Sequence, residues 1–113
     1  MCHEYWITRN SITRQVNLHC VDDALENLNA FLAMCRRSCL LEAVAALRAD
    51  PQGTYHSYPG EYLELSAQNG RVEAAIVLFG DRAEAHLPVP LFIRIATEYV
   101  DALNQMCREL GRG

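Results

Sequence analysis

Hydrophobic and polar positions alternate along two stretches near the N-terminus. Residues 3–9 are rich in aromatic and β-branched side chains, and residues 11–21 place apolar side chains on one face and polar ones on the other. Arg14 is the one polar residue on the apolar side. With Asn10 and Ser11 as a tight turn between them, the two stretches predict a β-hairpin.

The next stretch changes to helical spacing. The acidic pair at 22–23 suits a helix start, and neither Gly nor Pro interrupts the chain from there to Ala49. Apolar residues recur at intervals of three and four as far as Cys39, and then the stripe moves to another face. The pattern predicts either one long helix, continuous or kinked, or two helices broken near residues 37–38. We favour the single helix.

Three further stretches alternate and predict strands over 61–67, 71–79 and 82–89. The Asn-Gly pair at 69–70 is a strong signal for a two-residue hairpin turn, and Gly-Asp at 80–81 indicates the second turn. The middle stretch is apolar on both sides over its second half. It is therefore expected to be a central strand.

The last stretch, residues 91–110, has the pattern of an amphipathic helix, with Pro90 suited to its first turn and Gly111 to its end. Its apolar stripe comprises Phe92, Ile95, Ala96, Tyr99, Leu103, Met106, Cys107 and Leu110. The element order is ββ-α-βββ-α. We expect one α+β domain over residues 1–113, with an antiparallel sheet of about five strands and the helices packed on one face. The other face is left for water, a partner or a second subunit.

Composition and charge narrow the class of protein. Half of the residues are hydrophobic, the formal net charge is −4, and all ten basic residues are arginine. An acidic balance argues against nucleic-acid binding, which needs a basic face, and suits a basic protein partner. No stretch approaches about 18 consecutive apolar residues, and no secretory signal is visible. We expect a cytoplasmic protein without a membrane span.

Five cysteines are an odd number, and their spacing does not resemble a secreted disulfide framework. Helical spacing would place Cys35 and Cys39 one turn apart on one face, as half of a metal site. His19 and Cys20 would make a poor second pair of metal ligands, because they are adjacent in a strand and face opposite ways. We therefore expect core thiols, with no metal and no cofactor. The alternative is a small-molecule or metal-binding enzyme subunit that uses Cys20, Cys35, Cys39 and His19.

The sequence contains no pattern that combines a nucleophile with a base, and no glycine-rich phosphate loop, so we expect no catalytic residues. The loop over residues 50–60 carries two tyrosines and a histidine, and tyrosine brings contact area and a polar tip to interfaces. These aromatic side chains either bind a partner or cover the edge of the sheet. The candidate partner-binding residues are Tyr55, His56, Tyr58, Trp6, Arg36 and Arg37.

Taken together, these features favour a small non-catalytic protein-binding module in the cytosol. Bacterial immunity proteins and secretion chaperones are often compact acidic α+β domains of this size, and this is an analogy of class because no motif identifies one. The expected partner is another protein, such as a basic effector or toxin. A homodimer formed through an exposed sheet face or strand edge is a further alternative.

Overall fold

The computed structural model describes residues 5–10, 12–21 and 25–110, which form an α+β fold, as the sequence predicts. The strands in this part of the chain are β1 (Tyr5–Asn10), β2 (Gln15–Cys20), β3 (Tyr55–Ser57), β4 (Leu63–Gln68), β5 (Arg71–Leu78) and β6 (Asp81–Pro88). The helices are α1 (Leu28–Met34), α2 (Arg37–Ala49) and α3 (Val89–Leu110).

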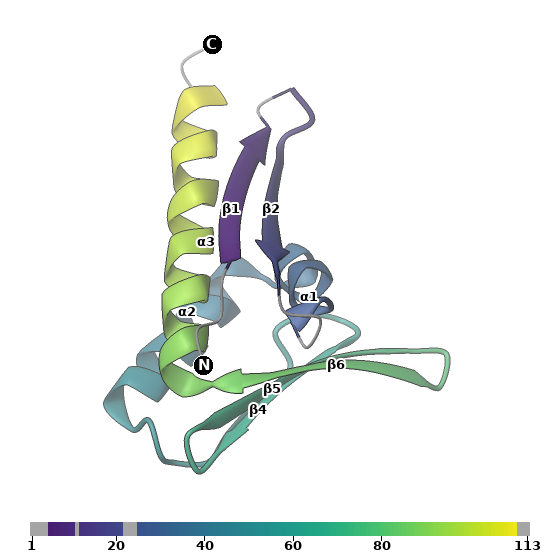
Figure 1. The fold of residues 1–113 in the computed structure, drawn as a ribbon, viewed down its shortest axis with the longest axis vertical. Coiled ribbons are helices and arrows are strands. Elements are labelled where there is room, and N and C mark those ends of the chain that lie inside the picture. Colours follow the sequence, from purple (N-terminus) through teal and green to yellow (C-terminus); the bar gives the residue numbers. More distant parts are fainter. Residues whose placement is uncertain (1–4, 11, 22–24, 111–113) are drawn as a thin grey trace.

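The prediction of a single sheet of about five strands is wrong. The strands form two antiparallel sheets, β1–β2 and β3–β4–β5–β6 (Figure 1). Two asparagines at α1 lie between them. Asn29 Oδ1 accepts the backbone N–H of Leu18 in β2 at 2.8 Å, and Asn27 Nδ2 donates to the backbone oxygen of Glu84 in β6 at 3.1 Å. These bonds satisfy backbone groups of β2 and β6 and connect the α1 region to both sheets.

The hairpin β1–β2 is confirmed, but its turn is longer than predicted. Asn10 pairs with Gln15, so the connection is longer than a two-residue turn and includes residues 12–14. Asn10 Oδ1 accepts two backbone N–H groups within this connection, at 3.0 and 3.2 Å. Arg14 has a φ of 58°, so it is a turn residue, and this explains why it does not fit the alternation of the strand.

The long helix favoured from the sequence is also wrong, because α1 and α2 are separated by an extended break at Cys35 and Arg36 (ψ 141° and 130°). The backbone N–H of Arg36 donates to the Pro59 carbonyl oxygen at 2.8 Å. Gly60 lies so close to the break that a Cβ there would stand 2.8 Å from the Met34 carbonyl oxygen. A loop that follows much later in the chain therefore ends α1 and replaces the next helical hydrogen bond.

Strands β4, β5 and β6 are confirmed, with β5 in the centre. Asn69 and Gly70 have φ angles of 53° and 82°, which fit the predicted two-residue turn. The second turn consists of Phe79 and Gly80 (φ 51° and 84°), one residue earlier than predicted. This difference moves the β5–β6 register by two residues. The short strand β3 lies within the predicted loop over 50–60 and pairs with β4.

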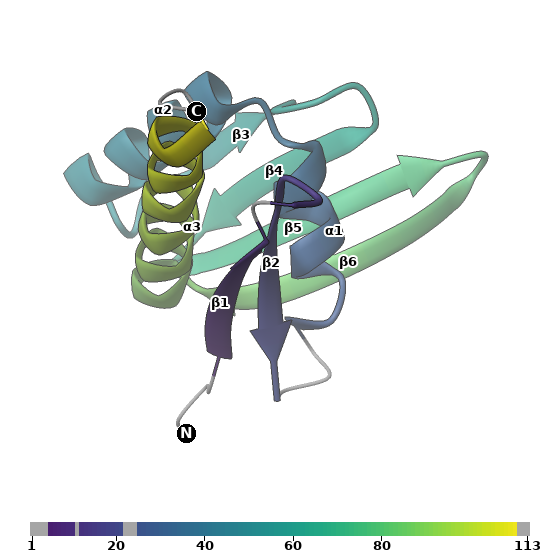
Figure 2. The ribbon, with the colours of Figure 1, turned by 90° about the horizontal axis from the view of Figure 1, so that it is seen from above.

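All three helices and the hairpin β1–β2 lie on one side of the four-stranded sheet (Figures 1 and 2). The sheet side chains that point to this side belong to the hydrophobic core, and they are Leu63, Leu65, Ala67, Val72, Ala74, Ala85 and Leu87. Most of the predicted apolar stripe of α3 packs into the same core, namely Phe92, Ile95, Ala96, Tyr99, Leu103 and Met106, whereas Cys107 is exposed. The predicted helix start at 22–23 and helix end at Gly111 lie outside the described residues.

Candidate functional site

The face of the four-stranded sheet that points away from the helices carries mainly polar and charged side chains. Side chains alternate along a strand, so each strand contributes every second residue to this face. We call it the open sheet face. It comprises His56, Glu64, Ser66, Glu73, Ala75, Val77, Arg82, Glu84 and His86.

The strand register places its polar side chains in rows. Ser66 lies opposite both His56 and Glu73, and Glu73 in turn lies opposite His86. This row therefore crosses all four strands. The neighbouring row has Ala75 between Glu64 and Glu84. The small alanine side chain leaves room for a long side chain to cross β5.

Arg82 makes that crossing and binds three carboxylates. Its Nη2 lies 3.0 Å from Glu64 Oε1 and 3.0 Å from Glu73 Oε1, and its Nε donates to Glu84 Oε2. The hydrogen bonds to Glu84, Glu73 and Glu64 raise the pKa of Arg82 above its ordinary value. A hydrogen bond with Glu73, together with Arg82, lowers the pKa of Glu84 to about 2. The three carboxyl groups outnumber the one guanidinium, so an excess of negative charge remains at this point.

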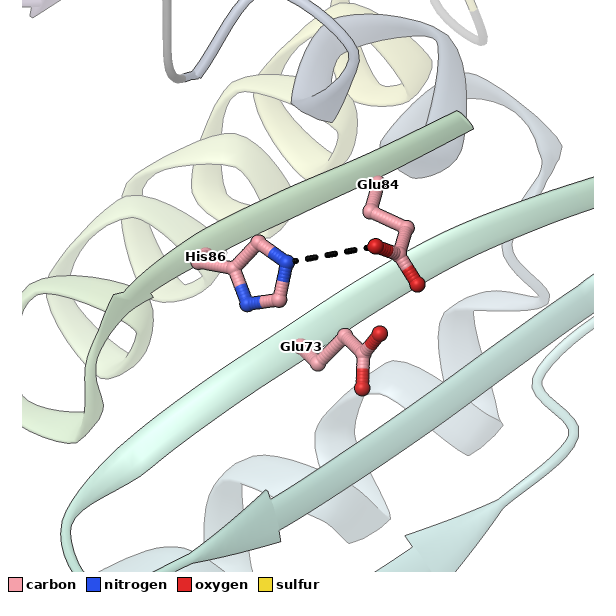
Figure 3. Close-up of side chains that lie close together, drawn as sticks. All are labelled: Glu73, Glu84 and His86. Atoms are coloured by element: carbon pink, nitrogen blue, oxygen red, sulfur yellow. Dashed lines mark hydrogen bonds and ion pairs between the residues drawn. The ribbon is translucent and has the colours of Figure 1, made fainter. Parts of the chain in front are cut away.

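Two histidines border the carboxylates. His86 Nε2 lies 3.4 Å from Glu84 Oε1 (Figure 3), and His56 Nε2 lies 4.0 Å from Glu64 Oε2. The His56 ring meets the Tyr58 ring edge-on, with centroids 4.9 Å apart. Beside them is an open hollow of about 380 Å³, lined by Thr54, Tyr55, His56, Ser66, Ala67, Gln68, Arg71, Val72, Glu73 and His86.

The structure brings some of the predicted partner-binding residues to this face and separates another from it. His56 and Tyr58 are exposed beside Glu64, whereas Tyr55 is half-buried and packs against the core. Trp6 lies in the other sheet, stacked on His19 at 5.3 Å between ring centroids. The predicted aromatic group is therefore split between the two sheets.

Trp6 lines a different and larger hollow, of about 800 Å³, between β1 and α3. Three of the polar side chains there bond to one another. Tyr5 donates its hydroxyl hydrogen to Glu98, and Arg94 Nε donates to the Tyr5 hydroxyl oxygen at 3.0 Å. These contacts join β1 to α3, so this hollow is a weaker candidate than the open sheet face despite its size.

The two predicted arginines lie at the break between α1 and α2. Arg36 and Arg37 are both exposed. The Arg37 guanidinium donates to Asn104 Oδ1 at 3.0 Å and approaches Cys107 Sγ at 3.6 Å, so it helps to attach α2 to α3. Both arginines lie in the layer of helices, apart from the open sheet face.

The cysteine set of the alternative prediction does not gather into one site in the structure. Among the described residues, the group of three or more metal-ligating side chains that lie together is Glu73, Glu84 and His86. Burial, followed by the nearby Cys39 thiol, raises the pKa of Cys35 to about 12. A thiol that keeps its proton is a poor nucleophile and a poor metal ligand.

Sequence reasoning missed Arg82 and the carboxylates it binds. Alternation along the strand puts Glu84 and His86 on one face, but it does not say which residues of the neighbouring strand they meet. The signal that could have joined them is the register of two tight turns, at 69–70 and 79–80, which follows once both turns are placed correctly.

No family model matches this chain, and no curated protein or solved structure matches it. None of the helices in the described residues has the length and apolar character that crossing a membrane requires.

Proposed function

We propose that this chain is a non-catalytic protein-binding domain and that its partner docks on the open sheet face. The observation that carries the proposal is the sharing of a single guanidinium, that of Arg82, by three carboxylates. The shared guanidinium holds the carboxylates in fixed positions and leaves an excess of negative charge. A fixed negative surface favours a partner with a basic surface and speeds its association.

The surroundings of the carboxylates suit a protein partner. Tyr58 is 65% exposed and Tyr62 is 46% exposed, and exposed tyrosines beside charged groups are common in protein interfaces. The low pKa of Glu84 keeps this carboxylate ionised near neutral pH, which favours recognition of a cation over proton transfer. A basic effector or toxin is the class of partner that fits this chemistry.

The same charge argues against self-association through this face. In a symmetric dimer each copy would present the same carboxylates to the other, and like charges would meet. We therefore propose a partner that differs from this chain. A homodimer would have to use another surface.

The test is affinity capture from extracts of the organism that encodes the chain, followed by affinity measurement with the captured protein. The open-face variant is Glu64→Gln/Glu84→Gln. The matched control is Glu26→Gln/Glu42→Gln, which removes the same charge from exposed positions outside the open sheet face. We expect the open-face variant to bind about tenfold or more weakly, which corresponds to about 1.4 kcal/mol or more, and the control to bind as the wild type does.

Two results would contradict the proposal. One is that no protein is retained by the wild type at low ionic strength. The other is that the captured protein binds both double variants equally well. Binding that weakens as salt rises is a further expected result, because exposed charges are screened.

A further inference from the structure

The row of side chains shared by β5 and β6 contains a set of metal ligands. Glu73, Glu84 and His86 each offer one ligand atom, and these atoms lie within 4.8 Å of one another. The backbone produces this arrangement, because Glu73 and His86 are directly opposite in the register and Glu84 is two residues before His86 on the same face. Figure 3 shows the imidazole and the two carboxylates turned toward a common space.

One pair of these atoms already has the spacing that a metal requires. Glu84 Oε1 and His86 Nε2 are 3.4 Å apart. Two ligands held tetrahedrally by one zinc ion, at about 2.1 Å each, lie about 3.4 Å apart. Glu73 has to approach them by a small movement of its side chain, which is only partly buried.

Arg82 occupies the other side of the carboxylates. It binds Glu73 through Oε1 and Glu84 through Oε2. Glu84 Oε1 therefore remains directed at His86, and the contact of Glu73 Oε2 with the Ser66 hydroxyl is long, at 3.5 Å. Ligating carboxylates in metal sites are themselves held by hydrogen bonds of this kind, which orient the free oxygen toward the ion.

Charge and access also suit a divalent cation. The negative charge that Arg82 leaves over favours a divalent cation. The hollow of about 380 Å³ is lined by Glu73 and His86, so the site opens to solvent. An imidazole nitrogen with two carboxylate oxygens is a ligand set typical of zinc and related transition metals, whereas calcium and magnesium prefer oxygen ligands alone.

We propose that Glu73, Glu84 and His86 form a binding site for a divalent transition metal, with zinc as the best match. Three protein ligands leave a fourth position for water or for a side chain of another molecule. Arg82 is the residue that positions the two carboxylates. The site shares Glu73 and Glu84 with the proposed docking face, but metal binding is measured on the isolated chain and needs no partner.

Zinc titration of the purified full chain under reducing conditions tests the site by calorimetry. We expect one ion per chain, with at least about tenfold weaker binding in His86→Ala and in Glu73→Gln/Glu84→Gln. His19→Ala and Glu42→Gln are the matched controls, since His19 is stacked on Trp6 in the other sheet and Glu42 is exposed on α2. Both controls should bind zinc as the wild type does.

The cysteines require a separate control, because thiolates bind zinc strongly. Cys35→Ser/Cys39→Ser should leave the affinity unchanged, and the His86 ring resonances should shift on titration of the wild type in an NMR spectrum. Circular dichroism of each variant shows that it is folded. The proposal is overturned by the lack of saturable binding at zinc concentrations below about 1 mM, by unchanged affinity in His86→Ala, or by loss of binding in the cysteine variant.

Discussion

The two faces of the four-stranded sheet are built by the same strands and have opposite characters. On the covered face, Leu65 and Leu87 have no exposed surface. On the open sheet face, the side chains of Glu64 and Arg82 are 29% and 36% exposed and bind each other. One stretch of chain thus serves packing on one side and presents charge on the other, because successive side chains point in opposite directions.

This comparison separates stability from recognition. Burial of apolar area on the covered face contributes most of the free energy of folding. Ion pairs that remain partly in water contribute little to it. Substitutions at neighbouring positions in one strand should therefore have effects of very different size.

The sharpest contrast is between Leu65→Ala and Ser66→Ala in β4. Leu65 is fully buried, so its truncation should lower the free energy of unfolding by about 2–5 kcal/mol. Ser66 points to the open sheet face, where its hydroxyl makes only a 3.5 Å contact to Glu73, and its loss should cost no more than about 0.5 kcal/mol. Urea denaturation of both variants measures the difference. Equal decreases in the free energy of unfolding of the two variants would contradict this contrast between the faces.

Low pH should weaken the interactions on the open sheet face and so lower the stability of the fold. The pKa of Glu84 falls from 4.5 to about 2 on folding, so the folded state holds this proton less tightly than the unfolded state does. The stability that Glu84 contributes is therefore present above pH 4.5 and is lost as the pH falls toward 2. In the wild type, the urea concentration at which half of the protein is unfolded should decrease as the pH is lowered through this interval.

Arg82→Met tests whether the Arg82 guanidinium causes this loss of stability at low pH. Without the guanidinium, the carboxylates repel one another and gain from protonation, so the midpoint should decrease less over the same interval. Arg48→Met is the matched control, because Arg48 donates to Thr97 Oγ1 at 3.2 Å. Its acid loss should equal that of the wild type. An equal loss in Arg82→Met would contradict the role given to Arg82.

Elements defined by a strong local pattern were predictable from the sequence. The apolar stripe of α3 and the alternation in β4 place the correct side chains in the core, as Phe92 and Leu65 show. The Asn-Gly turn at 69–70 follows from the preference for positive φ at both positions. Local chemistry decides each of these features.

Features decided by distant contacts were not predictable. The break between α1 and α2 depends on Pro59, whose carbonyl oxygen takes the N–H of Arg36, and nothing in residues 35–36 themselves excludes a helix. Asn27 and Asn29 bond to the backbone of β6 and β2, which belong to different sheets. Helix propensity and alternation contain no information about either contact.

The candidate site was missed for a related reason. Placing the second turn at 80–81 would set Glu73 opposite position 88 instead of His86, although it would keep Glu73 on the correct face. Periodicity therefore identifies which side chains are outward, while turn placement decides which of them meet. Phe79 caused the error, because a bulky residue is uncommon at positive φ.

A small effect is expected at this second turn, which joins β5 to β6 at the end of the sheet. Phe79 has a φ of 51° and its side chain is fully exposed, so it bears backbone strain without a packing contribution. Phe79→Asn should raise the free energy of unfolding by about 0.5–1 kcal/mol, since asparagine is favoured before glycine in such turns. The reverse change in the other turn, Asn69→Phe, should lower it by a similar amount. Urea denaturation measures both changes. A lower free energy of unfolding in Phe79→Asn would contradict the prediction, because it would mean that the aromatic ring stabilises the turn through packing.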